Sequence, residues 1–370
     1  MEKTSRRASA KSTSSSLVSL DDVAKRAGVS PATVSRALNG TAGVRAEMME
    51  KVRRACEELG YMPNGAARAL STRRSRTIGA IVPSIENEGF ARTISALQRR
   101  LKEAEYSLLL ACSDYDPAQE LHETRLLLSR GIDGIVLVGG AHDPALLPLI
   151  RQQKIPVVET WTLLKDQPSV GFDNALAAYQ LTDYLLSLGH RKVGIIAGRT
   201  SNNDRASARA AGVRDCLDKH GLTLHAELYV ERPYLILEGK GAMQTMMSAS
   251  SAPTAVVCAN DQIAFGALIG ANALGLSVPD DVSIAGFNDV VWSAHLSPPL
   301  TTVKVPAEEI GRASANFLLN CLAGESVVES VEVPVNLVVR GSTAPPPGAN
   351  EKFRAHKSAR VPPSSREQLD

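Results

Sequence analysis

Residues 22–38, DVAKRAGVSPATVSRAL, contain two short apolar-periodic segments that are separated by Gly28. The S-x-x-D pattern at residues 19–22 has the spacing of a capping box and predicts that a helix begins there. We expect this helix to end at Gly28, because glycine readily adopts the left-handed conformation of a helix C-cap. Ser30 would cap a second helix whose first residue is Pro31, a position where the missing N–H costs nothing. The stretch therefore predicts a compact helix–break–helix unit.

The two expected helices leave one polar face uncovered. Apolar positions at i, i+3, i+4 and i+7 mark the inner face of the first helix, and Val34 and Leu38 point back at it from the second. Small residues at the start of a helix, with an arginine one turn later, fit readout of the DNA major groove. From this pattern alone, an ordinary α-hairpin of a small helical domain is an equally good interpretation. The outer face of the second helix carries Pro31, Ala32, Thr33, Ser35 and Arg36.

The charge of the chain is distributed unevenly. Residues 1–76 contain 15 Lys and Arg against 7 Asp and Glu, a net charge of +8, whereas residues 77–370 contain 26 against 32, a net charge of −6. A basic N-terminal part on a mildly acidic body indicates that the N-terminal part binds a polyanion. A solvated basic tail is the alternative that this count leaves open.

From residue 77 onward, short apolar runs alternate with amphipathic segments. The runs include TIGAIVP, SLLLAC, GIVLVG, KVGIIAG, TAVVCA and VSIAGF, and the segments between runs include GFARTISALQRRLKEAE and DRASARAAGVRDCLDKH. This alternation predicts an α/β fold whose parallel sheets are covered on both faces. About ten strands exceed one comfortable doubly wound sheet, so we expect two doubly wound parallel-sheet subdomains with a cleft between them. Ligands of such sheets bind at the carboxyl ends of the strands.

Other classes of protein find little support. G-x-S-x-G is absent, Gly239-Lys240 lacks the rest of a P-loop, and the seven histidines have no metal-ligand spacing. We therefore expect neither an enzyme nor a cofactor or metal site. The five scattered cysteines include no C-x-x-C and indicate a reducing compartment. No apolar segment follows Arg6-Arg7 as in an export signal, and no run reaches the ~18 residues of a membrane span, so we expect a cytoplasmic protein without a membrane partner.

The continuation of the helical pair decides between these interpretations. A third amphipathic segment, VRAEMMEKVRRACEELG, is followed by YMPNGAARAL. Together, SLDDVAKRAGVSPATVSRALNG and ELGYMPNGAARAL closely resemble the headpiece and hinge of LacI/GalR (lactose repressor/galactose repressor) family transcriptional regulators. Later stretches such as PTAVVCANDQIAFGAL, GLSVPDDVSIAGFND and SPPLTTVKVP resemble the periplasmic-binding-protein-like core of that family. The resemblance covers about residues 18–341.

Composition and the resemblance together predict the domain organisation. The Ser/Lys/Arg-rich start and the Pro-rich, charged end predict disorder. Within the core, the resemblance implies an N-subdomain of about residues 77–172 and 305–332 and a C-subdomain of about residues 173–304 and 333–341. The expected order is a disordered arm (1–16), a helix-turn-helix DNA-binding headpiece (17–62), a hinge helix and linker (63–76), an effector-binding core (77–341) and a disordered tail (342–370).

The resemblance also implies which headpiece residues contact DNA. The residues on base-reading positions are Pro31, Ala32 and Arg36. Those on positions that contact or approach the phosphate backbone are Ser30, Thr33, Ser35 and Asn39.

The expected hinge adds contacts in the minor groove. Asn64 resembles the cap of a short helix, Ala67 matches a minor-groove contact, and Leu70 matches the leucine wedged into the central base step. We expect this helix to form only on DNA, because isolated helices below ~12 residues are marginal in water. Arg45 departs from the family pattern, since a small capping residue usually opens the third helix.

A second set of residues is expected to form an effector site in the cleft. Arg209 matches the arginine that binds polar groups of the effector, and Tyr234 lies where the family often has a ring-stacking aromatic residue. The remaining expected site residues are Phe90, Trp161, Phe172, Asp173, Asn260 and Asn288. Taken singly and without the resemblance, the phenylalanines and Tyr234 are better explained by core packing, and Asn260 by a helix cap.

Two departures bear on the effector. Asn288 replaces an aspartate that the family often carries in its G-F-[DN]-D motif, and Trp161 falls near a carboxylate of sugar-binding members. The chain thus has fewer negatively charged acceptors than these relatives but keeps Arg209, and this favours an anionic effector such as a sugar acid. A sugar or a related metabolite is the alternative that Asp173 leaves open.

The resemblance implies a regulator that binds double-stranded operator DNA. We expect a repressor that binds a pseudo-palindromic operator as a homodimer, or as a tetramer, and that a small-molecule effector controls. The alternative is a periplasmic-type sugar-binding protein with no role at DNA.

Overall fold

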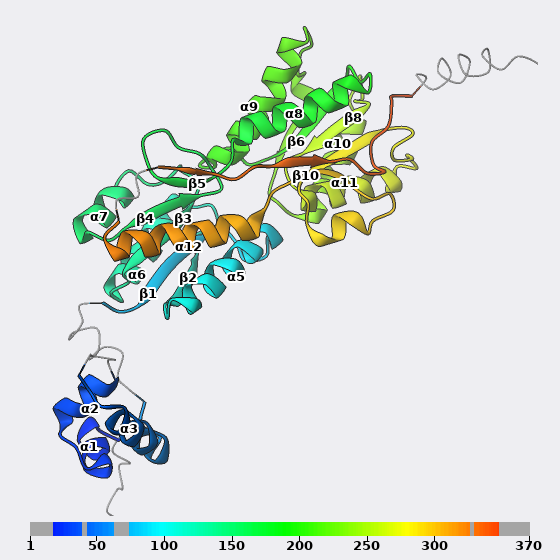
Figure 1. Cartoon of the computed structure of the whole chain (residues 1–370). Coiled ribbons are helices and arrows are strands. Elements are labelled where there is room, and N and C mark those ends of the chain that lie inside the picture. Colours follow the sequence, from blue (N-terminus) through cyan, green and yellow to red (C-terminus); the bar gives the residue numbers. More distant parts are fainter. Residues whose placement is uncertain (1–17, 39–42, 63–73, 326–328, 348–370) are drawn as a thin grey trace, which may run out of the picture. The chain divides into compact units, whose positions relative to one another are not determined.

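The computed structural model describes residues 18–38, 43–62, 74–325 and 329–347 (Figure 1). Its contacts divide the chain into two units, Met1–Ser75 and Arg76–Asp370. The expected arm, most of the hinge and most of the tail lie outside the described residues, as do Asn39, Asn64, Ala67 and Leu70.

The headpiece consists of three helices, α1 (Leu20–Ala27), α2 (Pro31–Leu38) and α3 (Ala46–Leu59). The expected capping box of α1 is confirmed, since the Asp22 N–H donates to Ser19 Oγ (3.3 Å) and the Ser19 N–H donates to Asp22 Oδ2 (3.0 Å). Gly28 follows α1 with φ 67°, as a left-handed C-cap requires. The buried core of the headpiece consists of Val23, Ala24, Val34, Val52 and Ala55.

The second and third helices begin differently. Ser30 Oγ accepts a hydrogen bond from the Thr33 N–H (3.2 Å) and caps α2 as expected. Arg45 precedes α3 without any side-chain hydrogen bond to the helix end, which agrees with its departure from the family pattern. The first turn of α3 therefore lacks a side-chain cap that typically stabilises a helix by ~1 kcal/mol.

The second unit contains two six-stranded sheets, which confirms the expected α/β class with two doubly wound subdomains. The strand orders are β11-β5-β4-β3-β1-β2 and β12-β10-β9-β8-β6-β7, and every described pair is parallel except β10 with β12. The first sheet consists of β1 (Thr77–Val82), β2 (Ser107–Cys112), β3 (Gly134–Val138), β4 (Val157–Thr160), β5 (Ser169–Gly171) and β11 (Val331–Glu332). The second consists of β6 (Val193–Gly198), β7 (Tyr229–Arg232), β8 (Ala255–Cys258), β9 (Ser283–Asn288), β10 (Thr301–Lys304) and β12 (Asn336–Val338).

Helices cover both faces of each sheet (Figure 1), because side chains alternate between the two faces along a strand. In β1, Ile78 belongs to the core that contains Leu97 of α5, whereas Ile81 belongs to the core beneath α6 and α7. In β6, Ile195 faces the core of α8 and α9, and Ile196 faces that of α10 and α11. The helices are α5 (Glu88–Glu103), α6 (Pro117–Ser129), α7 (Leu146–Gln153), α8 (Asn174–Ser187), α9 (Asp204–Lys219), α10 (Ile236–Met247), α11 (Asp261–Ala273) and α12 (Ala307–Ala323), with short 3₁₀ helices η1 (Ala226–Leu228) and η2 (Val291–Ala294).

The chain passes between the two sheets along three segments. They connect β5 with α8, β10 with α12, and β11 with β12. The loops after the carboxyl ends of strands from both sheets supply the walls of a shared cavity. This arrangement is the one in which doubly wound sheets bind ligands.

Candidate DNA-binding surface and effector cavity

The outer face of α2 presents the residues expected to contact DNA. Pro31, Ala32 and Arg36 are exposed, and Thr33 and Ser35 are half-buried. Val34 is fully buried on the opposite side and packs α2 onto the rest of the headpiece. The small residues at the start of the helix leave its backbone accessible, so base edges can approach it closely.

Arg36 takes no part in the ion pairs that join other cations of the described headpiece to glutamates. Arg26 forms an ion pair with Glu58, and Arg53 forms ion pairs with two glutamates of α3. Arg36 forms no ion pair within the described part of the chain, and its Nε donates to the Ala32 carbonyl oxygen (3.3 Å). Its guanidinium therefore lies along the exposed face, where its remaining donors suit the O6 and N7 acceptors of guanine.

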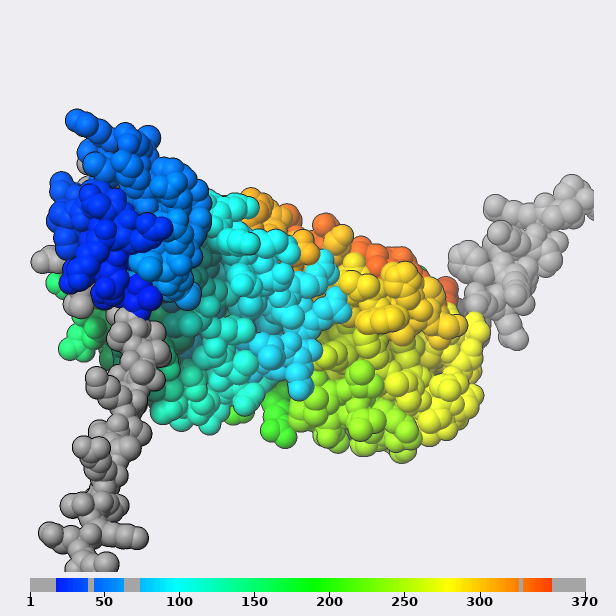
Figure 2. Space-filling view, turned by 90° about the horizontal axis from the view of Figure 1, so that it is seen from below, coloured from blue at the N-terminus to red at the C-terminus, as the bar shows by residue number. Residues whose placement is uncertain are grey.

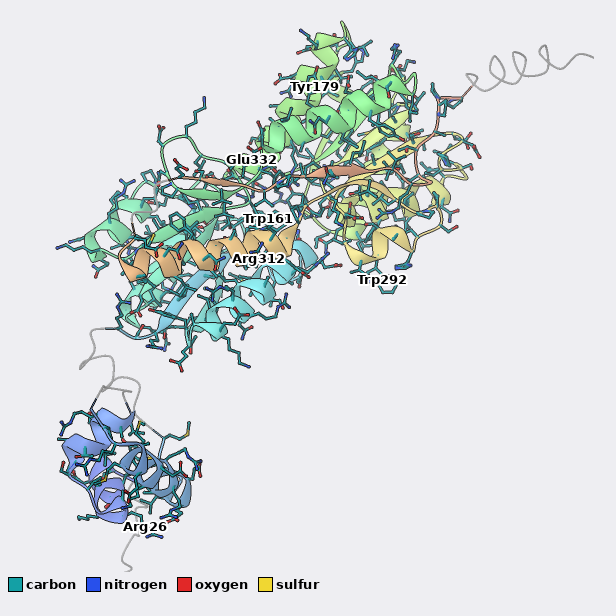
Figure 3. The ribbon with its side chains drawn as sticks, viewed as in Figure 1. Arg26, Trp161, Tyr179, Trp292, Arg312 and Glu332 are labelled. Atoms are coloured by element: carbon teal, nitrogen blue, oxygen red, sulfur yellow. The ribbon has the colours of Figure 1, made fainter. Side chains whose placement is uncertain are left out.

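In the core, side chains of both subdomains enclose a cavity. The space inside it that can hold the centre of a water molecule is about 20 Å³. This closed arrangement accommodates a water molecule or two, so a larger ligand requires the walls to move. Figure 3 shows Trp161, one of its residues, close to the junction of the subdomains. The cavity is lined by Asn87, Phe90, Tyr115, Trp161, Asn203, Arg205, Arg209, Tyr234, Asn260 and Asn288.

Aromatic rings form one wall of the cavity. The Phe90 ring meets Trp161 edge to face, with ring centres 5.0 Å apart and an interplanar angle of 77°. Behind Trp161, Phe172 lies 6.4 Å away and stacks on Phe287 at 6.1 Å. A flat, rigid apolar wall of this kind suits the C–H face of a compact ligand.

Two polar atoms of the wall have no hydrogen-bond partner among the described residues. Trp161 Nε1 and Asn288 Oδ1 are both buried and unpaired. Both residues also have left-handed backbone conformations, with φ 67° and 119°, which are strained for side chains of this size. Strain and unpaired buried polar atoms together typify a ligand site, where a bound molecule completes the hydrogen bonds.

Arg209 of α9 lies in the same wall and is almost completely buried. Its Nε donates to Asn174 Oδ1 (2.9 Å), its Nη1 donates to the Ala259 carbonyl oxygen (2.7 Å), and its guanidinium lies 4.0 Å from the centre of the Phe287 ring. Burial lowers the pKa of Arg209 to about 10, so the side chain remains charged at neutral pH. All three contacts are neutral, and they fix the orientation of the charge without cancelling it.

Arg205, one turn earlier on α9, takes part in closing the cavity. Its Nη1 pairs with Asp204 Oδ1 (2.7 Å), while Asp204 Oδ2 accepts a hydrogen bond from the Gly140 N–H of the first subdomain (3.1 Å). Gly139 has φ 86°, and a Cβ there would overlap Arg205 Nη1. The start of α9 therefore rests directly on the loop that follows β3.

Other contacts close the junction on its outer side. The Val291 N–H donates to Glu88 Oε1 (3.0 Å), and Gln262 Nε2 donates to the Glu86 carbonyl oxygen (3.3 Å). In Figure 2, the cyan residues at the start of α5 abut the yellow and orange residues of the second subdomain. These polar contacts lie on the outer side of the junction, while the stacked rings of Phe172 and Phe287 belong to a buried hydrophobic cluster that continues through both subdomains.

Tyr115 and Tyr234 approach each other from opposite subdomains. Their ring centres are 5.8 Å apart at an interplanar angle of 41°. Burial raises the pKa of Tyr115 well above its usual value, so the phenol stays neutral. The pair adds two hydroxyl-bearing rings to the cavity wall, which Phe90 and Trp161 also line.

Three asparagines of the wall are also helix caps. The Oδ1 atoms of Asn87, Asn203 and Asn260 accept hydrogen bonds from the first turns of α5, α9 and α11, at 2.9, 3.2 and 2.8 Å. The expectation that Asn260 caps a helix is thus confirmed, and the same residue lines the cavity. Three helices therefore direct their N-terminal, partially positive ends toward one space.

The neighbouring Asp261 holds the start of α11 in place through hydrogen bonds. Its carboxylate accepts hydrogen bonds from Thr302 Oγ1 (2.6 Å), Ser293 Oγ (2.8 Å) and the Val290 N–H (2.9 Å). Complete burial raises the pKa of Asp261 despite these bonds. The network ties the start of α11 to the segment after β9 and so positions Asn260 and Asn288.

The structure brings together six of the eight residues expected at the effector site, and places two elsewhere. Phe172 lies behind Trp161 and supports it. Asp173 is exposed and caps α8 through a hydrogen bond from the Leu176 N–H (2.9 Å). Neither is among the residues that line the cavity, which are Phe90, Trp161, Arg209, Tyr234, Asn260 and Asn288 of the expected set.

Four lining residues were not anticipated: Asn87, Tyr115, Asn203 and Arg205. Each follows the carboxyl end of a strand within a few residues, so the strand-end rule carried a signal for them. Arg205 lies four residues before Arg209, which puts both on one face of α9.

A possible metal-ligand cluster lies away from the cavity. The ligand atoms of Asp183, Cys216 and His220, on α8 and α9, are within 4.8 Å of one another. Burial raises the pKa of the Cys216 thiol to about 11, which disfavours the thiolate that a metal needs. His220 Nε2 is already within hydrogen-bond distance of Asp183 Oδ1 (2.9 Å), so the group is explained as a polar contact between two helices.

Comparison with known proteins identifies the family of this chain. Residues 19–64 match the bacterial regulatory proteins of the lacI family, and residues 182–343 match the periplasmic binding protein-like domain. Catabolite control protein A of Priestia megaterium is 30% identical over 329 residues, which cover 88% of this chain and 99% of that protein. The chain belongs to the LacI family of bacterial regulatory proteins. Another LacI-family relative, the ribose operon repressor of Haemophilus influenzae, is 32% identical over 304 residues, 82% of this chain and 91% of that protein.

The resemblance extends to three-dimensional structure. The crystal structure of the lac repressor dimer bound to operator and the anti-inducer ONPF matches with a TM-score of 0.80 and 28% identity, and the match covers 89% of this chain and 100% of that one. This LacI-family chain is a DNA-binding transcriptional regulator with a core suited to an effector. Its relatives are regulators rather than enzymes, and they favour this function over a sugar-binding protein with no role at DNA.

Proposed function

We propose that this regulator is a repressor that binds a pseudo-palindromic operator as a homodimer and that a small polar effector controls it. The observation that carries the DNA-binding part is the exposed face of α2, where small residues precede the exposed Arg36. Each headpiece would read one half-site in the major groove, and a twofold dimer would match the twofold operator.

An apolar surface of the second subdomain supports the dimer. Trp292 is 65% exposed, and Figure 3 shows it at the outer edge of that subdomain. Exposed aromatic and aliphatic side chains that gather around one groove mark a protein interface. A second copy of the chain is the occupant that a LacI-family regulator requires. The apolar residues around this groove are Ile236, Phe265, Leu268, Ile269, Val290, Trp292 and Leu296.

The effector would act through the junction of the subdomains. The cavity is too small for a sugar or sugar acid in the closed arrangement, so a bound effector changes how the subdomains meet. Both subdomains contribute to the wall, and only a ligand that binds two arrangements with different affinity can shift their populations. Because wall residues come from both subdomains, an effector that binds them can favour one arrangement of the two subdomains over another.

The cell compartment follows from the function. A regulator of transcription acts where the chromosome is, which is the cytoplasm in bacteria. In the described part of the chain, no helix combines the length and apolar character that a bilayer crossing needs.

Operator selection tests the proposal directly. The full-length protein, mixed with fragments of the genomic DNA of its own organism, is expected to enrich sites with two inverted half-sites. Gel filtration of the protein without DNA is expected to give the mass of a dimer or tetramer. Enrichment of no sequence, or of unpaired half-sites by a monomer, would contradict the proposal.

A further inference from the structure

The cavity carries an excess of positive charge. Two guanidiniums, those of Arg205 and Arg209, line it, and no carboxylate is among the lining residues. Asp204 pairs with Arg205, whereas Arg209 is held by an amide, a carbonyl oxygen and an aromatic ring. Among the described residues Arg209 thus forms no ion pair of its own, and a buried charge is costly unless it is paired.

The helix termini add to this potential. The N-terminal ends of α5, α9 and α11 reach the cavity through Asn87, Asn203 and Asn260. A helix N-terminus favours negative charge, and these helices have 16, 16 and 13 residues. The combined field therefore favours a negatively charged ligand.

The unpaired wall atoms specify more than charge. Trp161 Nε1 is a donor that needs an acceptor, and Asn288 Oδ1 is an acceptor that needs a donor. These residues are 2% and 8% exposed, so water outside the cavity does not satisfy them. A ligand that satisfies both atoms offers an acceptor to Trp161 Nε1 and a hydroxyl or amine donor to Asn288 Oδ1.

We infer that the effector is a small hydroxy acid, a monocarboxylate with at least one hydroxyl group. Its carboxylate binds Arg209 and Arg205 and its hydroxyl donates to Asn288, while Trp161 Nε1 donates to one of its oxygens. The inference rests on the proposed effector control and names the chemical class of the effector.

Two neighbouring classes fit less well. A neutral sugar would leave Arg209 without a counter-ion and would offer only neutral acceptors to the cationic wall. A sugar phosphate would bring a dianion to a wall that has one uncompensated positive charge and no lysine among its lining residues. The charge balance therefore selects a monoanion.

Matched ligand pairs test the charge requirement. The thermal unfolding of the full-length protein is measured with D-gluconate against D-glucitol and D-glucose, D-galactonate against galactitol and D-galactose, D-glycerate against glycerol, and with D-glucose 6-phosphate. We expect at least one acid to raise the Tm while its neutral counterparts do not, because only a ligand of the native state stabilises it. Equal or greater stabilisation by a neutral counterpart, stabilisation by the phosphate alone, or no effect of any acid would overturn the inference.

Substitutions locate the binding acid in the cavity. Asn288→Asp places a carboxylate in the wall. We expect this variant to bind the acid about tenfold or more weakly, because the two negative charges repel each other. Arg205→Gln is expected to weaken binding as well, whereas Arg214→Gln removes an exposed charge from the same helix and should leave the affinity unchanged. Unchanged affinity for the acid in Asn288→Asp, measured by calorimetry, would place the acid elsewhere and overturn the inference.

Failure here is separable from failure of the proposed function. Operator affinity is measured on the same preparations by fluorescence anisotropy. If a neutral sugar raises the Tm and changes operator affinity, the regulator is effector-controlled but its effector is not an acid. If no selected DNA binds at all, the proposed function fails whatever the acids do.

Discussion

The two functional regions of this chain are built in opposite ways. The proposed DNA-binding face belongs to one eight-residue helix, is exposed, and makes its own local hydrogen bonds. The effector cavity collects residues from separate loops and helices of two subdomains, buries a cation, and leaves two polar atoms unpaired. A surface for a polymer with regular grooves needs only a rigid helix with the right face, whereas a cavity for a small molecule needs groups that converge and lose their water.

This difference predicts how each region responds to substitution. Substitutions on the exposed face of α2 should lower the affinity for DNA in proportion to the contacts removed and should leave the fold intact. The cavity should lose its ligand response at single positions, because buried charges and unpaired atoms act together.

The largest effect is expected at the buried cation. Arg209→Ala should abolish the stabilisation by the acid effector, which amounts to about 2.7 kcal/mol at a hundredfold excess over its Kd. Affinity of the effector-free protein for operator should change little, since Arg209 lies in the other unit of the chain. Thermal unfolding with and without the acid measures the first effect and anisotropy the second. A normal rise in Tm for the variant would remove Arg209 from the site.

The next effect concerns the exposed arginine. Arg36→Ala should weaken operator binding by about 1–3 kcal/mol and relax the preference at one base pair of each half-site. Binding to random DNA should weaken less. Lys25→Ala, which removes an exposed charge of α1, serves as the control for net charge. Equal losses on operator and random DNA would show that Arg36 contacts phosphate rather than a base.

A smaller effect is expected where α9 rests on the first subdomain. Asp204→Asn keeps the shape of the side chain but turns its charge-assisted bond to the Gly140 N–H into a neutral one, a loss of about 1 kcal/mol. The closed arrangement should become less populated. Without effector, the amide of Gly140 should exchange faster in the variant than in the wild type. Unchanged protection there would mean that other contacts hold the junction closed.

The smallest effect concerns the headpiece fold. Arg45→Ser should supply the missing side-chain cap of α3 and stabilise its first turn by about 0.5–1 kcal/mol. Arg45→Ala is the matched control and should have no such effect, since Arg45 makes no cap bond to lose. Amide exchange of residues 46–49 in the full-length protein measures both. Equal protection in the two variants would contradict the capping argument.

The headpiece was the easier region to predict from sequence because its structure is set by local rules. Capping residues, a left-handed glycine and a 3.6-residue period specify α1 and α2, and all of these signals lie within a few residues of the helices that they define. The exposed face of α2 then follows as the side that Val34 does not occupy.

The cavity could be predicted only in part, because its residues meet through long-range packing. Arg209 and Trp161 were expected from the family resemblance. Arg205 and Tyr115 were missed, although both follow the carboxyl ends of strands and Arg205 shares a face of α9 with Arg209. Phe172 and Asp173 lie next to each other at the end of β5, where the same rule suggested a ligand contact, yet one packs inward and the other caps α8. Strand order tells where a site forms, and the packing of side chains decides which residues line it.

The central claim is that a ligand in the cavity changes what the headpiece does. The most direct measurement is a titration of fluorescently labelled operator with full-length protein, with and without the acid that stabilises it, for the wild type and Arg209→Ala. We predict that the acid shifts the operator Kd of the wild type severalfold and leaves that of Arg209→Ala unchanged. An operator Kd that is the same with and without the acid in the wild type, while the acid still raises its Tm, would contradict the claim.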